Sequence, residues 1–470
     1  MTEPAQEAKE MSGEQEEDAA AETRALNENG KDVDVAEVIS VPAASEAQEK
    51  KLHPEGGWGW MVVLGSALAH FLVVGLGRSF GIFYLDLLDR FQQSAFATSL
   101  VVAIHNTTRQ MLGPVTGMLS DRFTCQKVVF TGGIVMCIGC VISAFATNLP
   151  YLYVTFGALA GFGGALIFTP SYVIIGQYFD KKKGKAMGFS TIGSGLGTVA
   201  LAPIITLLLF HYSYFGAMLI MGAIMLNNCV SGALYRPLPQ FTKSKKKKTP
   251  EDATDLETGT SEPALTRSQK ISRKFAILGN FTFLIYGLQI TAMSVCIQTF
   301  LTYLPGIAKQ YGADDGPSSF LLSVVGIADM VGRFSWGFFF DMKGVQHRRR
   351  LFHALLGLPV GGFAILNGFM TSYVGFLIVT VLFGFVEGGF HSQRATIVSE
   401  FVAKDQMAST VGFVIAFQGV GNMLGPPVGG LIKDETGSYN GCYFFAGACL
   451  FVTSSIFLLN YFYKSWRSRR

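Results

Sequence analysis

The sequence predicts an all-α polytopic membrane protein with twelve transmembrane helices, arranged as two bundles of six. Half of the 470 residues are apolar and only 15% are charged, and the mean hydropathy is +0.37, whereas soluble domains carry about 25% charged residues. Twelve apolar runs reach the length of about 20 residues that a spanning helix needs. A long polar segment follows the sixth run and divides the twelve into two equal sets.

Each run predicts one spanning helix. The runs cover residues 58–84, 96–119, 127–147, 150–177, 186–210, 213–235, 275–304, 318–340, 351–371, 373–398, 407–432 and 440–463. Because their number is even, both ends of the chain are expected on the same side of the membrane.

The basic residues indicate which side that is. They collect in every second connection, whereas the opposite connections carry acids and few bases. Loops rich in Lys and Arg stay in the cytoplasm, so both termini are predicted to be cytoplasmic. The basic positions are Lys127 and residues within 180–185, 243–248, 347–350 and 464–470.

Three polar segments complete the predicted domain organisation. Residues 1–53 hold fourteen acids and five bases and are expected to form a disordered cytoplasmic tail. Residues 236–274 are expected to be a flexible cytoplasmic linker, whose lysines are either solvated or rest on anionic lipid. The linker separates bundles 54–235 and 275–463, and a basic tail follows at 464–470. The rest of the chain has a positive net charge, which lies in the short loops and the C-terminal tail. This charge indicates membrane topology and not a nucleic-acid partner.

The eighth run contains one acid and one base, Asp329 and Arg333. Residues four apart lie one turn apart on an α-helix, so these two side chains can pair on a single face. Ionisable residues inside a membrane are costly and usually belong to a substrate or proton path. This pair is therefore the first candidate for the functional site.

The ends of the second and eighth runs resemble each other. We expect the glycines to let neighbouring helices approach closely and the acids to pair with bases between the bundles as a cytoplasmic gate, although an ordinary helix end explains them too. The two patterns are Gly113-x3-Gly117-x3-Asp121-Arg122 and Gly332-x4-Gly337-x3-Asp341.

Enzymatic chemistry has little support in this sequence. Cys137-x-x-Cys140 lies in an apolar run, where free cysteine usually packs as a small hydrophobe. The sequence contains no metal-ligand cluster, nucleophile elbow or phosphate-binding loop. We therefore expect no enzyme, no metal and no cofactor.

Two longer motifs carry a family resemblance. Pro54-Glu-Gly-Gly-Trp-Gly-Trp60 enters the first run, and Tyr178-Phe-Asp-Lys-Lys-Lys-Gly-Lys-Ala-Met-Gly188 enters the fifth and continues to Gly193 and Gly197. They resemble the paired signatures of the monocarboxylate transporter family (solute carrier family 16), a branch of the major facilitator superfamily. The resemblance covers essentially the whole membrane region and implies the major facilitator fold and a substrate carrier.

The resemblance also implies roles for three residues. In proton-coupled members a basic residue late in helix 1 and an Asp-x3-Arg pair in helix 8 handle proton and carboxylate. The helix 8 pair matches Asp329 and Arg333. The helix 1 position is Arg78, where those members carry lysine; arginine keeps its charge and is a poor proton donor.

The tenth run shows a second departure from the family. Glu387 stands where short-chain carriers place an aromatic side chain, and Arg394 follows about two turns later. Glu387 either pairs with an arginine or repolarises and widens the substrate cavity. His105 and Arg109 in the second run, and His391 in the tenth, are expected to be packing or cavity-lining residues.

The expected function is proton-coupled symport of small monocarboxylates such as lactate or pyruvate, by alternating access. Arg78, Arg333 and Glu387 would bind substrate, and Asp329 would couple the proton. Arg78 and Glu387 keep a second hypothesis open, facilitated transport of a zwitterion such as an amino acid or a creatine-like solute. A sensor that does not transport is the third. The resemblance also implies the plasma membrane and a single-span glycoprotein chaperone as partner.

Overall fold

The computed structural model describes residues 54–179, 182–238, 276–346, 348–399 and 407–467. Within Glu55–Arg470, which form one compact unit, every regular element that is described is a helix. The predicted N-terminal tail and most of the predicted linker lie outside the described residues, as do the side chains of Asp121, Asp341 and Arg394.

Ten helical stretches of the described chain are long and apolar enough to cross a membrane. One of them, Gly184–Leu234, turns at Ser213, whose φ of 54° interrupts the helix, so it supplies two crossings. Residues 95–123 supply one more, in two short helices. The twelve predicted crossings are therefore present.

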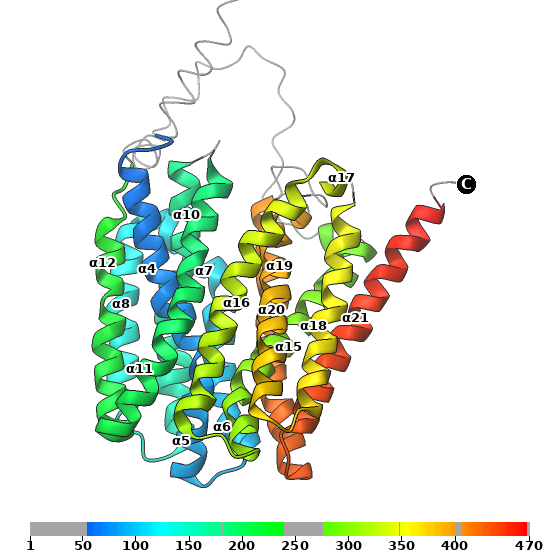
Figure 1. Cartoon of the computed structure of the whole chain (residues 1–470). Helices are drawn as coiled ribbons and strands as arrows, with labels where there is room; N and C mark the ends of the chain where they lie inside the picture. The colour runs from blue at the N-terminus through cyan, green and yellow to red at the C-terminus, as the bar shows by residue number, and fades with distance from the viewer. Residues whose placement is uncertain (1–53, 180–181, 239–275, 347, 400–406, 468–470) are drawn as a thin grey trace, which may run out of the picture. The chain divides into compact units, whose positions relative to one another are not determined.

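The first bundle (Figure 1, blue to green) contains the helices that end before the linker. They are α4 (Trp58–Arg78), α5 (Phe80–Phe91), α6 (Ala95–Met111), α7 (Gly113–Phe123), α8 (Cys125–Ser143), α9 (Leu149–Leu152), the π-helical η1 (Tyr153–Ala160), α10 (Gly161–Tyr178), α11 (Lys183–Leu226) and α12 (Asn228–Leu234).

The second bundle (Figure 1, yellow-green to red) follows the linker. It contains the short 3₁₀ turn η3 (Ala276–Gly279), then α15 (Phe281–Gln310), α16 (Asp315–Asp341), α17 (Lys343–Gln346), α18 (Arg349–Phe369), α19 (Tyr373–Ser399), α20 (Met407–Thr436) and α21 (Asn440–Arg467). Helix α21 continues into the segment that the sequence assigned to the basic tail.

Some predicted runs are broken helices, and the breaks follow local chemistry. The second run divides at Leu112, and Pro114 lies in the first turn of α7. Proline is tolerated there because the first helical N–H groups have no intrahelical acceptor. The first run divides at Ser79, directly after Arg78. This break places Arg78 in the last turn of α4, where a cation is favoured by the helix dipole.

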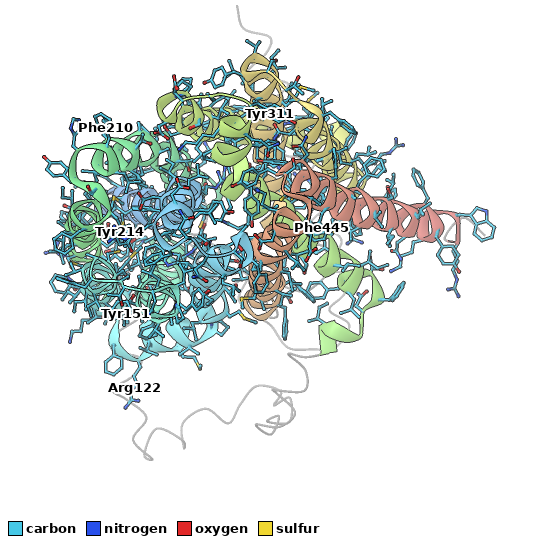
Figure 2. All side chains as sticks on the ribbon, turned by 90° about the horizontal axis from the view of Figure 1, so that it is seen from below. Arg122, Tyr151, Phe210, Tyr214, Tyr311 and Phe445 are labelled. Carbon is cyan, nitrogen blue, oxygen red and sulfur yellow. The ribbon has the colours of Figure 1, made fainter. Side chains whose placement is uncertain are left out.

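Viewed along the helices, the two bundles lie side by side (Figure 2). Tyr151 and Tyr214 mark the first bundle, and Tyr311 and Phe445 mark the second. Helix α11 packs on α16, and α6 packs on α20. The first of these contacts is close because glycines face each other: a Cβ atom on Gly326 would lie 2.9 Å from the carbonyl oxygen of Gly195.

The glycines after the second family motif pack α11 against α4. A Cβ atom would approach the carbonyl oxygen of Ala67 to 2.0 Å at Gly193 and that of Phe71 to 2.1 Å at Gly197. These two glycines therefore let α11 pack closely on α4. Any larger residue would force these helices apart.

The glycines of the two repeated patterns behave differently from one another. A Cβ atom on Gly332 would lie 2.1 Å from the carbonyl oxygen of Phe385, so the predicted close approach is confirmed there. At Gly117 the nearest atom would be 3.9 Å away, and at Gly337 a Cβ atom meets nothing within 4 Å among the described residues. The expectation was wrong for these two positions, because their helix faces do not meet a neighbouring helix closely.

The two family motifs contact each other. The backbone N–H of Glu55 donates to the carbonyl of Tyr178 (3.1 Å), and the Glu55 carboxylate accepts from the backbone N–H of Lys182 (3.1 Å). The ring of Trp60 packs on Phe179, with centroids 5.4 Å apart. Sequence segments that enter helices 1 and 5 therefore form one structural unit at the end of the first bundle.

Candidate functional site

Arg78 connects the two bundles through a buried ion-pair cluster. Its Nη1 donates to Oδ2 of Asp329 at 3.0 Å, and its Nη2 donates to Oε1 of Glu387. Arg78 lies on α4 of the first bundle, whereas the acids lie on α16 and α19 of the second. Both carboxylates are fully buried, and Arg78 is 8% exposed. One guanidinium can serve two carboxylates because it presents five N–H donors in a planar fork.

The ion pair predicted within helix 8 is present in the same cluster. Nε of Arg333 lies 3.0 Å from each oxygen of Asp329. On α19, Nε2 of His391 lies 3.4 Å from Oε1 of Glu387, one turn away. Asp329 therefore contacts two arginines, and Glu387 contacts one arginine and one histidine.

A polar cavity of about 100 Å³ lies beside this cluster and takes residues from both bundles. It has room for several water molecules or one small solute. Its ionisable lining consists of His70, Arg78 and Arg109 from the first bundle, and Arg333 and His391 from the second. Asp329 and Glu387 lie behind the arginines. Further polar lining comes from Asn106, Gln110, Tyr172, Thr191, Ser194, Gln298, Gln418 and Asn422.

Arg109 lines the same cavity from the first bundle. Its guanidinium carbon lies 4.9 Å from the ring centroid of Phe168, and its Nη2 donates to Oδ1 of Asn106 at 3.0 Å. Among the described residues, no carboxylate lies within ion-pair distance of Arg109, and its Nε has no hydrogen-bond partner. Arg109 is only 6% exposed, so in the described part of the chain this cation is buried without a matching anion.

The charges of the ion-pair cluster alone are balanced. Arg78 and Arg333 against Asp329 and Glu387 sum to zero. The structure adds Arg109 to the same cavity, so the described site carries one net positive charge with its histidines neutral. An isolated buried charge is costly, and an incoming anion would remove that cost.

The remaining candidates from the sequence lie outside the cavity lining or outside the described residues. His105 lies outside the cavity lining: it stacks on Phe156 and its Nδ1 contacts the Phe156 carbonyl at 3.2 Å, as expected for a packing residue. Arg122 of the predicted gate is exposed and lies over the Phe123 ring. The side chains of Asp121, Asp341 and Arg394 lie outside the described residues.

Sequence reasoning did not single out His70, which lines the cavity from α4. Its Nδ1 lies 2.7 Å from the Ser66 carbonyl oxygen. The available signal was an ionisable side chain in the middle of an apolar run, which is uncommon unless it faces a cavity or a partner.

Comparison with known proteins shows which family has this architecture. The family model described as Major Facilitator Superfamily matches residues 66–379 and 355–469. Monocarboxylate transporter 12-B of Danio rerio is 31% identical over 434 residues, covering 88% of this chain and 90% of the relative. The chain belongs to the monocarboxylate transporter family of the major facilitator superfamily. A second family member, monocarboxylate transporter 13 of Bos taurus, is 32% identical over 407 residues, covering 86% and 90% of the two chains.

Membership in the monocarboxylate transporter family makes this chain a multi-pass secondary carrier and not an enzyme. The fold agrees at the level of solved structures. A crystal structure of a point mutant of the nucleoside transporter NupG superposes with a TM-score of 0.66 at 12% identity, covering 86% of this chain and 99% of that one. This likeness concerns the fold alone.

Proposed function

We propose that this carrier moves one small monocarboxylate together with one proton, by alternating access of its two bundles. The observation that supports this proposal is the buried cluster in which Arg78 of the first bundle holds Asp329 and Glu387 of the second. These ion pairs hold the two bundles in contact until the Arg78 side chain exchanges its carboxylate partners. A carboxylate can replace Asp329 on the arginines, and a proton can neutralise the Asp329 that it displaces.

The substrate carboxylate competes with Asp329 for the arginines. A guanidinium matches a carboxylate bidentately, and Arg333, which is 18% exposed at its side chain, lies at the cavity surface. Displacement from both Arg333 and Arg78 would leave Asp329 buried and unpaired, which is strongly unfavourable. A proton on Asp329 removes that penalty and cancels the added charge, so the loaded and the empty site carry the same charge.

The groups that contact Asp329 and Glu387 determine how the substrate carboxylate and the proton can replace the existing ion pairs. Among the described residues, the basic ones are Arg78 on α4, Arg333 on α16 and His391 on α19, and the Cys296 thiol on α15 also lies near Glu387. Because arginine stays protonated, the proton path has to use the acids or His391 and not Arg78. Asp329 is the proposed coupling residue, and Arg78, Arg333 and Glu387 are the proposed substrate-site residues.

A second candidate function rests on Glu387. Its Oε2 has no hydrogen-bond partner among the described residues. The ammonium group of a zwitterion could donate to this oxygen while its carboxylate meets an arginine. Such a solute adds no net charge and would need no proton.

Purified carrier in liposomes separates the candidates. We expect an inward proton gradient to drive uptake of labelled lactate and to acidify the lumen, and Asp329→Asn to abolish the response to the gradient. Asp89→Asn, which changes an exposed acid at the far end of α5, is the matched control. Uptake of an amino acid or creatine at a rate independent of the proton gradient would support the second candidate. The absence of uptake for both classes of solute would favour a sensor.

The remaining assignments belong to the same proposal. The linker end of the bundles, where Arg236 and Arg348 lie, would face the cytoplasm, with Asp121, Arg122 and Asp341 as gate residues and both termini inside. The plasma membrane and a single-span glycoprotein chaperone follow from family membership by analogy. Surface labelling of epitopes placed at either terminus tests this orientation, and labelling of intact cells would contradict it.

A further inference from the structure

The first-bundle wall of the cavity contains four buried polar atoms that have no hydrogen-bond partner among the described residues. They are Nε2 of His70, Nδ2 of Asn106, Nε of Arg109 and Oε1 of Gln110, and all four residues line the cavity. Buried polar atoms are normally satisfied, and each unsatisfied one costs free energy. Their concentration on one wall indicates that a polar solute completes their hydrogen bonds.

The charges on this wall favour an anion. Arg78 and Arg333 are already bonded to acids, whereas Arg109 contacts the Asn106 amide oxygen and the Phe168 ring. A carboxylate meeting Arg109 displaces no protein acid. Arg109 is therefore available to the substrate before any proton has rearranged the ion-pair cluster.

His70 adds a hydrogen-bond acceptor to the same wall. A carbonyl oxygen can only accept, so the 2.7 Å contact with the Ser66 carbonyl makes Nδ1 of His70 the donor. A neutral imidazole that donates from Nδ1 has Nε2 as an acceptor. The imidazole and Arg109 both pack on Phe168: the His70 and Phe168 centroids are 5.5 Å apart, and Cζ of Arg109 lies 4.9 Å from the same centroid.

We infer that Arg109 and His70 form a substrate subsite that selects small hydroxycarboxylates over the corresponding oxocarboxylates. The carboxylate binds the guanidinium of Arg109, and the hydroxyl group donates to Nε2 of His70. An oxo oxygen can only accept a hydrogen bond. It therefore leaves Nε2 of His70 unsatisfied and places two acceptors, the oxo oxygen and Nε2, next to each other, which is unfavourable. This inference rests on the proposed carboxylate transport and adds both the capturing cation and the basis of selectivity.

The first test concerns Arg109. In liposomes we expect Arg109→Gln to raise the KM for lactate about ten- to hundredfold, the range for losing a charge-assisted hydrogen bond, with a smaller change in kcat. Arg109→Lys should recover part of the loss. The matched control is Arg90→Gln, because Arg90 also lies 4.9 Å from an aromatic centroid, that of Tyr214, but is exposed outside the cavity.

The second test concerns His70. The wild-type carrier should show a lower KM for lactate than for pyruvate, and for 3-hydroxybutyrate than for acetoacetate. His70→Leu and His70→Gln should reduce this preference about five- to tenfold; Gln donates as well as accepts, so it serves both substrates. His105→Gln is the matched control, since His105 is equally buried and also contacts a backbone carbonyl.

The outcomes separate this inference from the function on which it rests. A wild-type carrier that takes up none of the four acids contradicts the proposed function itself. Uptake by wild type with an unchanged KM in Arg109→Gln overturns the role of Arg109. An unchanged preference in both His70 variants, or a wild type without preference, overturns the role of His70. Thermal unfolding of each purified variant identifies a loss that arises from misfolding.

Discussion

At the scale of single residues, the arginine at position 78 explains how two acids are accommodated in the membrane. Its Nη1 and Nη2 each serve a different carboxylate, Asp329 and Glu387. A lysine ammonium is a compact charge without this planar fork. Arg78 replaces the lysine of proton-coupled relatives, and Glu387 is the extra acid on α19. The two departures belong together, because the guanidinium can bind the second carboxylate.

A double-mutant cycle tests whether Arg78 and Glu387 stabilise each other. Removing one partner of a buried pair strands the other charge and costs about 3–5 kcal/mol, whereas removing both can be nearly neutral. We expect Arg78→Gln and Glu387→Gln each to lower the unfolding temperature of the purified carrier, and the double variant to lose less than the sum of the two. Glu435→Gln, an exposed acid at the end of α20, is the control. Additive losses would contradict the coupling.

Prediction of the site from the sequence succeeded where the partners are close along the chain. Asp329 and Arg333 are four residues apart on one helix, so their pairing follows from helical geometry. Arg78 and Glu387 are separated by 309 residues, and no local rule relates them. Arg109 was expected to pack or to line the cavity, and it lines the cavity. Its proximity to His70 could not be predicted, because only the packing of α4, α6 and α10 places the two in one cavity.

At the scale of elements, the end of the bundles that contains Ser213 is closed by contacts between the halves. Asp434, near the end of α20, accepts hydrogen bonds from the backbone N–H of Ala95 (2.7 Å) and of Phe96 (2.9 Å) in the first turn of α6. A carboxylate is favoured there because the first N–H groups of a helix have no partner within it. Gly430 supports this contact, since its Cβ atom would lie 2.7 Å from the Ala95 backbone.

We therefore expect Asp434 to stabilise the conformation in which the two bundles are in contact at the end that contains Ser213. Loss of a helix-capping side chain costs ~1 kcal/mol, about a fivefold change in an equilibrium. We expect Asp434→Ala to speed labelling of a cysteine introduced as Thr302→Cys several-fold when an impermeant thiol reagent is added from that side. Thr302 is 1% exposed, and its carbonyl faces Gly81 of the other bundle. The same carrier without Thr302→Cys gives the background rate, and Asp89→Ala should leave the rate unchanged.

The family motifs also acquire a physical explanation at this scale. The tryptophans of the first motif, Trp58 and Trp60, are 44% and 41% exposed, and exposed tryptophan is common at a membrane interface. Trp58 additionally donates from Nε1 to the Leu234 carbonyl at 3.1 Å, and Trp60 packs on Phe179. The motifs therefore join the start of α4 to the ends of α10 and α12.

At the scale of the whole molecule, the net charge of the transport cycle distinguishes the mechanisms. One proton and one monocarboxylate together carry no charge, whereas an anion alone carries one, worth about 2.3 kcal/mol per 100 mV of membrane potential. We expect the final accumulation of lactate in liposomes to follow the proton gradient. An imposed potassium diffusion potential should leave it unchanged. Accumulation that changes about tenfold or more with a potential of roughly 60–100 mV would indicate transport of the anion without a proton.

The sequence by itself determined the class of the molecule, its twelve crossings and its division into two bundles. These features depend on properties that are local in the chain: the length of apolar runs, the placement of basic residues and the polar linker. It also identified the helix 8 pair and, through its two motifs, the family. Each of these follows from residues within a few turns of one another.

Only the tertiary structure decided which charges meet. It brought Arg78 to Asp329 and Glu387, placed Arg109 in the cavity beside them, and gave the described cavity a net positive charge. The physical reason is that helix packing sets which faces of α4, α6, α16 and α19 point inward, through close contacts such as Gly197 on Phe71 and Gly332 on Phe385. Electrostatic energies depend on distance and burial, and neither is contained in the order of residues along the chain.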